Sequence, residues 1–378
     1  MRKKGKKGVF KFVFGIFIVW QLVINLLAFA GPKFLLSQER FMYNEKDKSF
    51  IFLWNRANFD GAHYLGISRY GYGLHQQAFF PFYPKLISRL SQIFGGNNLL
   101  AALFISNASF LLALFIFYRL VNLDFDESTA KRSLIFFLLF PTAFFLGMAY
   151  SEGLFLLLIL ACFYAARKQK WFLAGILGGL ASYTRVIGIF LFPALIWEWY
   201  QEYKNKSYKL KIKNFLPLLL APSGLLFFMR SLWLKYGDPL MFIHTQPFFG
   251  AERSGGKIIL LYQVFWRYIK MILTTRRDVL YLSVWLECLS AILFLFLIVL
   301  AYKKKIRASY LIFAVFAYLL PTLSGTFSSL PRYVLAIFPC FIILGLIKSR
   351  ALRVFLYSIF GLGLIVYSLL FFQGYWVS

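Results

Sequence analysis

The chain is short of cysteine and of acidic residues. Its 378 residues include three cysteines and 14 Asp and Glu, against 42 Lys and Arg. The cysteines lie far apart in apolar runs without the spacing of metal ligands, so packing is their expected role and no disulfide framework is predicted. The chain also lacks an internal repeat, a low-complexity linker, a phosphate-binding glycine loop and a dinucleotide-binding fingerprint.

Apolar residues are abundant in the chain. Hydrophobic residues make up 60% of it, 47 residues are Phe, and apolar runs close to the length of a membrane span recur along the sequence. The formal net charge of +28 would suggest nucleic acid in a soluble protein. In a membrane protein, the distribution of the positive residues among the loops indicates which side of the bilayer each loop occupies. The composition therefore predicts an all-α polytopic membrane protein with no nucleic-acid partner.

The apolar runs predict about eleven transmembrane helices. They are expected at roughly 9–30, 99–121, 133–148, 152–167, 171–183, 186–200, 214–234, 280–301, 308–321, 332–347 and 353–372. Several of these runs are shorter than a bilayer crossing requires. We expect the short spans, such as 171–183 and 332–347, to be tilted, paired, broken or extended into the neighbouring loops.

Basic residues orient the chain in the membrane. With the basic N-terminal residues 2–7 in the cytoplasm, all the short connections on that side are basic too. These connections are 167–170, 201–213, 302–307 and 348–352. The long connections 31–98 and 235–279 then face the extracytoplasmic side, and the composition favours a prokaryotic plasma membrane. A cleaved secretory signal ending near residue 30 is the alternative, but the apolar run is longer than a signal core usually is.

The polar segment after the first apolar run carries the most informative motif. Asp60, His63 and Tyr64 follow a spacing of three and four residues, with Ile67 at the seventh position. A helix would place these four side chains on one face. One carboxylate, one imidazole and one phenol would then point the same way at a membrane surface.

This motif resembles the first extracytoplasmic loop of PIG-V-like mannosyltransferases, relatives of the second mannosyltransferase of glycosylphosphatidylinositol anchor synthesis. The matching segments are Phe59-Asp60-Gly-Ala-His63-Tyr64-Leu-Gly-Ile67, Gly71-Tyr72, Ala78-Phe-Phe-Pro81-Phe-Tyr-Pro84, Tyr150-Ser-Glu152, Ala181-Ser-Tyr-Thr-Arg185-Val-Ile-Gly188, Gly237-Asp-Pro239, Arg332-Tyr333 and Phe338-Pro339. They cover nearly the whole chain in order. The family usually has Trp directly before the acid, where this chain has Phe59, so the branch and the acceptor stay open.

The resemblance implies a GT-C type integral-membrane glycosyltransferase that uses a polyprenyl-phosphate-linked sugar, with mannose as the expected hexose. It implies one polytopic domain over 1–378, with the catalytic motif in a first outer loop, 31–98, that contains short amphipathic helices. A lipid-carried donor agrees with the predicted topology, because nucleotide sugars are cytoplasmic and the active face is outside. The expected partners are this donor, a lipid, glycan or protein acceptor, and membrane lipids.

Inverting transfer needs a base that takes the proton of the acceptor hydroxyl. By its match to the family motif, Asp60 is the expected base, with a solvated or hydrogen-bonded loop aspartate as the alternative. Glu152 is the second acid, or a first-turn glutamate that suits the helix dipole. His63 is expected to position the acceptor, bind the donor phosphate or help Asp60 hold a divalent metal. With two ligands close in sequence, a metal is the less favoured choice.

Arginines are the predicted ligands of the donor phosphate, because a guanidinium matches phosphate bidentately. Arg185 and Arg332 are expected at the outer starts of spans, where the helix dipole disfavours a cation and a nearby anion would account for them. The alternative is snorkelling to phospholipid head groups. Arg276 and Arg277 in the second long connection are weaker candidates for the same role.

Three further residues are predicted to position the substrate. Tyr64 belongs to the first motif, and its alternative role is that of an interfacial anchor. Tyr333 follows Arg332 in the family-like pair. Asp238 lies in Gly-Asp-Pro, where a plain turn residue is the simpler interpretation.

Two other functional classes compete with an enzyme. A transporter or lipid flippase would show discontinuous helices in matched halves or ionisable residues near the middle of the membrane, and the sequence shows neither clearly. A noncatalytic membrane scaffold would keep the fold without the chemistry. The intact motif around Asp60 argues against a scaffold.

Overall fold

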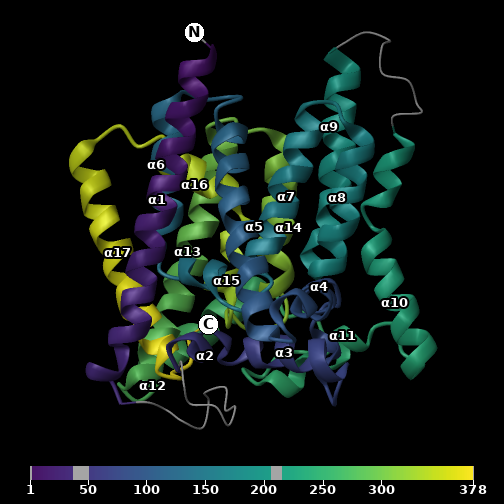
Figure 1. Ribbon diagram of the computed structural model, residues 1–378, viewed down its shortest axis with the longest axis vertical. Helices are drawn as coiled ribbons and strands as arrows, with labels where there is room; N and C mark the ends of the chain where they lie inside the picture. Colours follow the sequence, from purple (N-terminus) through teal and green to yellow (C-terminus); the bar gives the residue numbers. More distant parts are fainter. Residues whose placement is uncertain (1, 37–50, 206–214, 378) are drawn as a thin grey trace.

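The computed structural model describes residues 2–36, 51–205 and 215–377, which form a bundle of helices without a β-strand (Figure 1). The remaining residues include 37–50 of the first long connection and 206–214, which overlaps the basic connection 201–213 predicted to be cytoplasmic. Those two parts of the topology prediction therefore lie outside the described residues. The prediction of an all-α fold is confirmed.

Among the residues that the structure describes, five stretches are long and apolar enough to cross a membrane. They are Gly8–Ala30 within α1 (Arg2–Ala30), α5 (Asn98–Val121), Leu216–Tyr236 with η9 (Leu216–Leu220) and α10 (Ser223–Tyr236), α13 (Val279–Lys303) and α17 (Arg350–Phe372). Shorter bundle helices are α6 (Glu127–Leu139), α7 (Glu152–Arg167), α8 (Trp171–Thr184), α9 (Leu191–Asn205), α14 (Ala308–Thr322) and α16 (Phe338–Gly345). These helices define an integral membrane protein. The number of crossings stays a prediction.

Several of the expected spans are not single α-helices: 186–200 consists of a 3-10 turn followed by α9, and 214–234 of η9 followed by α10. Two more are broken. Over 133–148, α6 ends at Leu139 and the chain passes Pro141 into the 3-10 helix η6 (Ala143–Gly147). Over 332–347, α15 (Leu330–Tyr333) and η11 (Val334–Ala336) precede α16. Proline disfavours helical backbone in the residue before it, which explains the break at Phe140 before Pro141. In α16, Pro339 lies in the first turn, where its missing backbone donor is tolerated.

The helices of the two long connections gather at one end of the bundle. They are α2 (Ile51–Trp54), η3 (Asn55–Ala57), α3 (Asp60–Tyr70), η4 (Gln76–Ala78), α4 (Phe82–Ser91), η5 (Gln92–Phe94), α11 (Met241–His244), η10 (Gln246–Phe249) and α12 (Leu261–Thr274). In Figure 1 the helices α2, α3, α11 and α12 lie near the C-terminus, and the N-terminus lies at the opposite end. Segments of both long connections therefore meet at the same end of the molecule.

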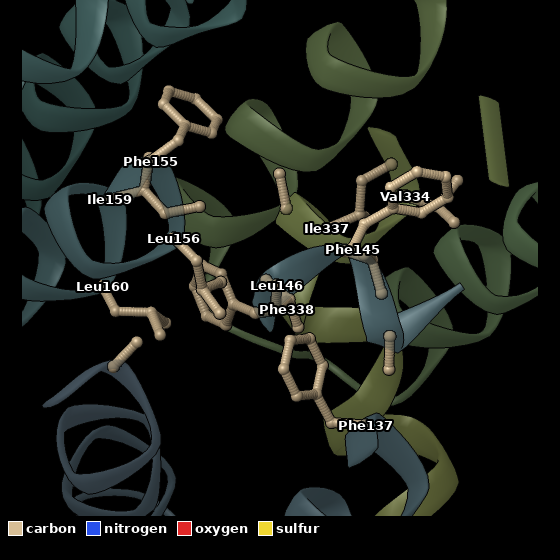
Figure 2. Packing of buried hydrophobic residues seen from close by; sticks show 14 of the residues in the cluster. Phe137, Phe145, Leu146, Phe155, Leu156, Ile159, Leu160, Val334, Ile337 and Phe338 are labelled. Atoms are coloured by element: carbon tan, nitrogen blue, oxygen red, sulfur yellow. The ribbon is translucent and has the colours of Figure 1, made fainter. Parts of the chain in front are cut away.

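The interrupted segments are held by close packing in the middle of the bundle. Figure 2 shows Leu146 of η6 next to Phe338 of α16, with Leu156 of α7 on the side toward them and Phe155 further along α7. These four side chains are buried. Inside a membrane protein such contacts stabilise through dispersion and close fit, because lipid is as apolar as the interior. The packing fixes the first turn of α7 against the broken segments.

Glycines let α8 and α10 approach closely, and this contact predicts a large effect of one methyl group. A Cβ at Gly224 would collide with the carbonyl oxygen of Gly179 and lie 2.6 Å from the Tyr183 nitrogen. We expect Gly224→Ala to separate the helices at a cost of about 1–3 kcal/mol and to lower the melting temperature in detergent by about 3 °C or more. Gly15→Ala on α1 is the matched control, since its Cβ would meet nothing within 4 Å. Equal melting temperatures for the two variants would contradict the close contact.

Candidate active site

The site begins where α3 begins. Asp60 is the first residue of α3, at the end of the helix where the dipole favours a negative charge. The preceding residue, Phe59, has φ 55 and ψ −118, which is rare for a residue with a side chain and turns the chain sharply into the helix. Its ring packs against Phe371 and Trp376 of the C-terminal region, at 5.9 and 5.2 Å between centroids. The turn before Asp60 is thus held by a distant part of the chain.

A second support comes from the segment before α7. The Tyr150 hydroxyl donates to the Asn58 carbonyl oxygen at 2.7 Å, and the Asn58 side-chain amide donates to the Phe371 carbonyl oxygen at 3.0 Å. Tyr150 and Asn58 are both buried. These bonds tie the backbone next to Asp60 to the start of α7, where the second acid of the motif lies.

Two carboxylates and two guanidiniums meet in what we call the charge cluster: Asp60, Glu152, Arg185 and Arg332. Arg332 Nη1 lies 2.7 Å from Asp60 Oδ2, and its Nε lies 2.9 Å from Glu152 Oε1. Arg185 Nη1 donates to the same Glu152 oxygen at 2.6 Å. The side chains are 19%, 6%, 12% and 8% exposed in the order named. The four residues predicted from the sequence as acids and phosphate ligands therefore form one largely buried, electrically balanced group.

Electrostatics keeps Asp60 ionised. Burial by itself would raise the pKa of the Asp60 carboxyl, but Arg332 and, less strongly, His63 lower it, and the net pKa lies below its ordinary value. Burial lowers the pKa of His63, and Asp60 opposes this only in part. At neutral pH Asp60 is therefore an anion, the form that a proton acceptor requires, and His63 is neutral.

Tyr64 connects α3 to the charge cluster. Its hydroxyl lies 2.9 Å from Ser151 Oγ, which is itself 3.4 Å from Arg185 Nη1. Tyr64 is 6% exposed. The alternative role of an interfacial anchor is therefore wrong for Tyr64, because its ring is enclosed by the protein. The motif is helical in the structure, which is the condition for its side chains to share one face.

His63 contacts both long connections. Its Nδ1 lies 3.2 Å from Gln76 Nε2, and its ring stacks on Phe79 with 4.8 Å between centroids. The ring of Phe249, from the second long connection, meets it edge-on at 5.5 Å. His63 therefore lies one helical turn from Asp60 with a defined orientation.

The two arginines differ from their predicted setting. Arg185 follows the last residue of α8 as well as preceding η7 (Val186–Phe190), and the C-terminal end of a helix favours a cation. Arg332 lies inside the short helix α15, away from a long helix start. Both guanidiniums turn inward to carboxylates, so snorkelling to lipid head groups does not describe their geometry. The sequence predicted that an anion lies near each arginine, and in the structure these anions are the carboxylates of Glu152 and Asp60.

A small cavity adjoins the charge cluster, with a volume of about 10 Å³ that admits about one water molecule. It is lined by Leu146, Glu152, Phe155, Leu156, Arg185, Ile187, Arg332, Tyr333, Leu335 and Ala336. The second oxygen of the Glu152 carboxylate, Oε2, is buried and has no hydrogen-bond partner within the described ranges. Tyr333 packs its ring 4.7 Å from the Arg185 guanidinium. The cavity thus offers an acceptor oxygen to a small polar group.

The other predicted residues lie elsewhere. Asp238 caps a turn after α10, with Oδ1 accepting from the Leu240 nitrogen at 2.9 Å and Oδ2 2.7 Å from His244 Nδ1. The bond from His244 lowers the pKa of Asp238. Arg276 and Arg277 are exposed between α12 and α13, and no contact within the described parts joins them to the charge cluster. The turn interpretation fits Asp238, and the roles of Arg276 and Arg277 at the donor stay predictions.

Sequence reasoning did not single out Arg253. Its Nη2 donates to Ser329 Oγ at 3.0 Å and to the Ser328 carbonyl oxygen at 3.3 Å, directly before α15. Its positive charge also helps to lower the pKa of Asp60. Nothing in the local sequence distinguishes it from the neighbouring cation Lys257. A surplus of cations in the second long connection, 235–279, was the only available signal.

The site offers few side chains that could bind a metal ion. In the part of the chain that the structure describes, no three His, Cys, Asp or Glu side chains are grouped to hold an ion. Asp60 and Glu152 are both in the site, but Arg332 contacts each of them and lies between them. Any divalent ion would have to compete with that guanidinium.

Comparison with known proteins places this site in a family. A family profile described as Mannosyltransferase (PIG-V) matches residues 20–236, more than half of the chain. The class of the protein is therefore that of the membrane glycosyltransferases. The chain belongs to the PIG-V mannosyltransferase family, as the sequence motifs predict. A search of curated proteins found no match.

Among solved structures, the chain is similar to the oligosaccharyltransferase of Archaeoglobus fulgidus. Its apo form has a TM-score of 0.49 and 14% identity over 97% of this chain and 56% of that one. The complex with an inhibitory peptide and a dolichol-phosphate has a TM-score of 0.47 and 13% identity over the same shares, 97% and 56%. The complex with zinc and sulfate has a TM-score of 0.46 and 14% identity over 94% and 53%. The chain spans little more than half the length of these structures.

Proposed function

We propose that the protein transfers a hexose, with mannose as the expected sugar, from a polyprenyl-phosphate-linked donor to an acceptor hydroxyl at the extracytoplasmic membrane face. The observation that carries the proposal is Asp60, an ionised carboxylate at the first residue of α3, held by Arg332 at the end of a membrane bundle. Membership in a mannosyltransferase family supports the sugar. The acceptor is a lipid, a glycan or a protein.

Asp60 would act as the base of an inverting displacement. Arg332 holds Oδ2, which leaves Oδ1 for the acceptor hydroxyl, and the side chain is 19% exposed and so within reach of a substrate. As the acceptor oxygen forms its bond to the anomeric carbon, the bond to the donor phosphate breaks on the opposite face and the hydroxyl proton passes to Asp60. The phosphate leaves with its polyprenyl chain.

The neighbouring residues would support this step without taking the proton. Arg332 keeps the Asp60 carboxylate in one orientation, which lowers the cost of reaching a reactive geometry. Glu152 positions the guanidiniums of Arg332 and Arg185, which stabilise the leaving phosphate. We assign Tyr64 and Tyr333 to positioning: Tyr64 acts through Ser151 on Arg185, and Tyr333 packs on the same guanidinium.

The donor class is tested with the wild-type protein. Purified full-length chain in lipid vesicles, with a membrane extract as acceptor, is expected to transfer labelled mannose from polyprenyl-phosphate-mannose and none from GDP-mannose. Transfer from GDP-mannose alone would overturn the lipid-linked donor. Transfer from another polyprenyl-linked sugar would overturn only the choice of mannose. Translocation of the lipid without transfer of any sugar would make the protein a flippase.

A further inference from the structure

We propose that Arg253 binds the phosphate of the lipid-linked donor, in a subsite formed with the serine-containing segment that precedes α15. The inference rests on the transfer reaction proposed above and adds a residue that the reaction lacks. In this proposal the donor phosphate is bound by three guanidiniums, those of Arg185, Arg332 and Arg253. Arg253 supplies the positive charge that balances the phosphate.

The first step of the argument is charge balance. In the charge cluster, Arg332 lies between Asp60 and Glu152, and Arg185 is bonded to Glu152, so two guanidiniums already balance two carboxylates. A donor phosphodiester brings one negative charge, and its phosphate becomes more negative as the sugar leaves. An uncompensated charge in a partly buried site is costly. The reaction therefore needs a cation beyond the two in the cluster.

The second step is the position of Arg253. Its guanidinium rests on Ser329 Oγ and the Ser328 carbonyl oxygen, and Arg332 follows three residues after Ser329 in the same short element. Ser329 has φ 67, an unusual backbone for a residue with a side chain, of the kind that concentrates at functional sites. Hydroxyl and carbonyl oxygens hold Arg253 there without neutralising it. The guanidinium thus keeps its full charge next to the charge cluster.

The third step concerns the acid beside Arg253. Glu252 is paired with a different arginine, since Arg267 Nη2 lies 2.6 Å from Glu252 Oε2. No carboxylate pairs with Arg253 anywhere in residues 2–36, 51–205 and 215–377. The three residues before Arg253, Gly250 to Glu252, all have positive φ, at 74, 56 and 47. This backbone separates the Glu252 and Arg253 side chains and sends them to different partners.

The fourth step is the anchoring of the loop. The Ser254 nitrogen donates to the Ser324 carbonyl oxygen at 2.8 Å, and the Ile259 nitrogen donates to the Leu323 carbonyl oxygen at 3.0 Å. Arg267 Nη1 donates to the Gly325 carbonyl oxygen at 3.1 Å. The segment that carries Arg253 is therefore fastened to the segment that leads into α15. Such support keeps a guanidinium ready for an incoming phosphate at a low entropic cost.

The test measures binding of polyprenyl phosphate to the full chain in nanodiscs of phosphatidylcholine, together with the donor KM and kcat. We expect Arg253→Gln to weaken binding of polyprenyl phosphate and to raise the donor KM by about tenfold, since a hydrogen bond between charged groups is lost. Arg253→Lys should weaken binding less than Arg253→Gln, because lysine keeps the positive charge but cannot donate two parallel hydrogen bonds to the phosphate. Lys257→Gln is the matched control: it removes an exposed cation from the same loop and should leave both values unchanged.

Competition identifies the source of the phosphate. Phosphatidylglycerol and inorganic phosphate are added as competitors, and thermal unfolding confirms that each variant is folded. Wild-type affinity and KM in a folded Arg253→Gln variant would overturn the proposal. Equal loss of affinity for phosphatidylglycerol would overturn the donor assignment in favour of a general phospholipid site. If the wild type binds polyprenyl phosphate through Arg253 but transfers no sugar, the proposed function fails while the phosphate subsite stands.

Discussion

Asp60→Asn is expected to lower the rate of sugar transfer by about 10²–10⁴-fold, because an amide cannot take the proton of the acceptor hydroxyl. The loss should appear in kcat with little change in the donor KM, since the change removes the base and leaves the arginines in place. The measurement is transfer of labelled mannose from polyprenyl-phosphate-mannose by the purified variant in lipid.

Two controls separate chemistry from folding in this experiment. Asp60→Asn removes one partner of Arg332, yet Glu152 still holds that guanidinium, so the variant should remain folded with a modest loss of thermal stability. Asp278→Asn is the matched substitution at the exposed N-cap of α13, where Asn caps as well as Asp and transfer should be unchanged. Transfer within tenfold of wild type by a folded Asp60→Asn protein would remove Asp60 from the role of base.

Arg332→Met is expected to destabilise the protein by about 3–5 kcal/mol, because it leaves buried carboxylates without their shared cation. Arg185 can balance Glu152 but not Asp60 as well. Sugar transfer should also be lost, since the orientation of Asp60 depends on Arg332. The measurements are thermal unfolding in detergent and the transfer assay.

A double variant tests the electrostatic cause of this instability. In Asp60→Asn with Arg332→Met, the remaining pair of Glu152 and Arg185 is balanced again, so the double variant should be more stable than Arg332→Met alone while staying inactive. Additive losses in the double variant would show that packing, and not unpaired charge, explains the single one. A melting temperature of Arg332→Met equal to wild type would contradict the buried ion pair altogether.

The sequence was a good guide to the polar residues of the site because charged groups are rare in apolar segments and stand out there. Asp60, Glu152, Arg185 and Arg332 were each identified from their motifs and their places beside predicted spans. Their partners could not be predicted, since more than 270 positions separate Asp60 from Arg332, as their residue numbers show. The arginines were predicted to be ligands of the donor phosphate, whereas the structure pairs them with the carboxylates of Asp60 and Glu152.

Local patterns were less reliable where the helices break. The segments 133–148 and 332–347 are apolar enough to predict spans, but prolines and packing divide them into shorter pieces. Arg253 escaped notice for a related reason. Its position depends on three consecutive residues of positive φ and on contacts with a segment about 75 positions later, as the bonds to Ser328 and Ser329 show. Neither feature leaves a pattern in the sequence.

By itself, the sequence determined the class of the protein and the chemical types available to the site, because hydrophobic run length, the scarcity of acids and short motifs are local properties. The family followed from the same local patterns. Only the tertiary structure decided which carboxylate meets which guanidinium, and that Arg253 keeps an unbalanced charge beside them. Ion pairing depends on distances of a few ångströms between residues far apart in the chain, and those distances are set by the packing of the whole bundle.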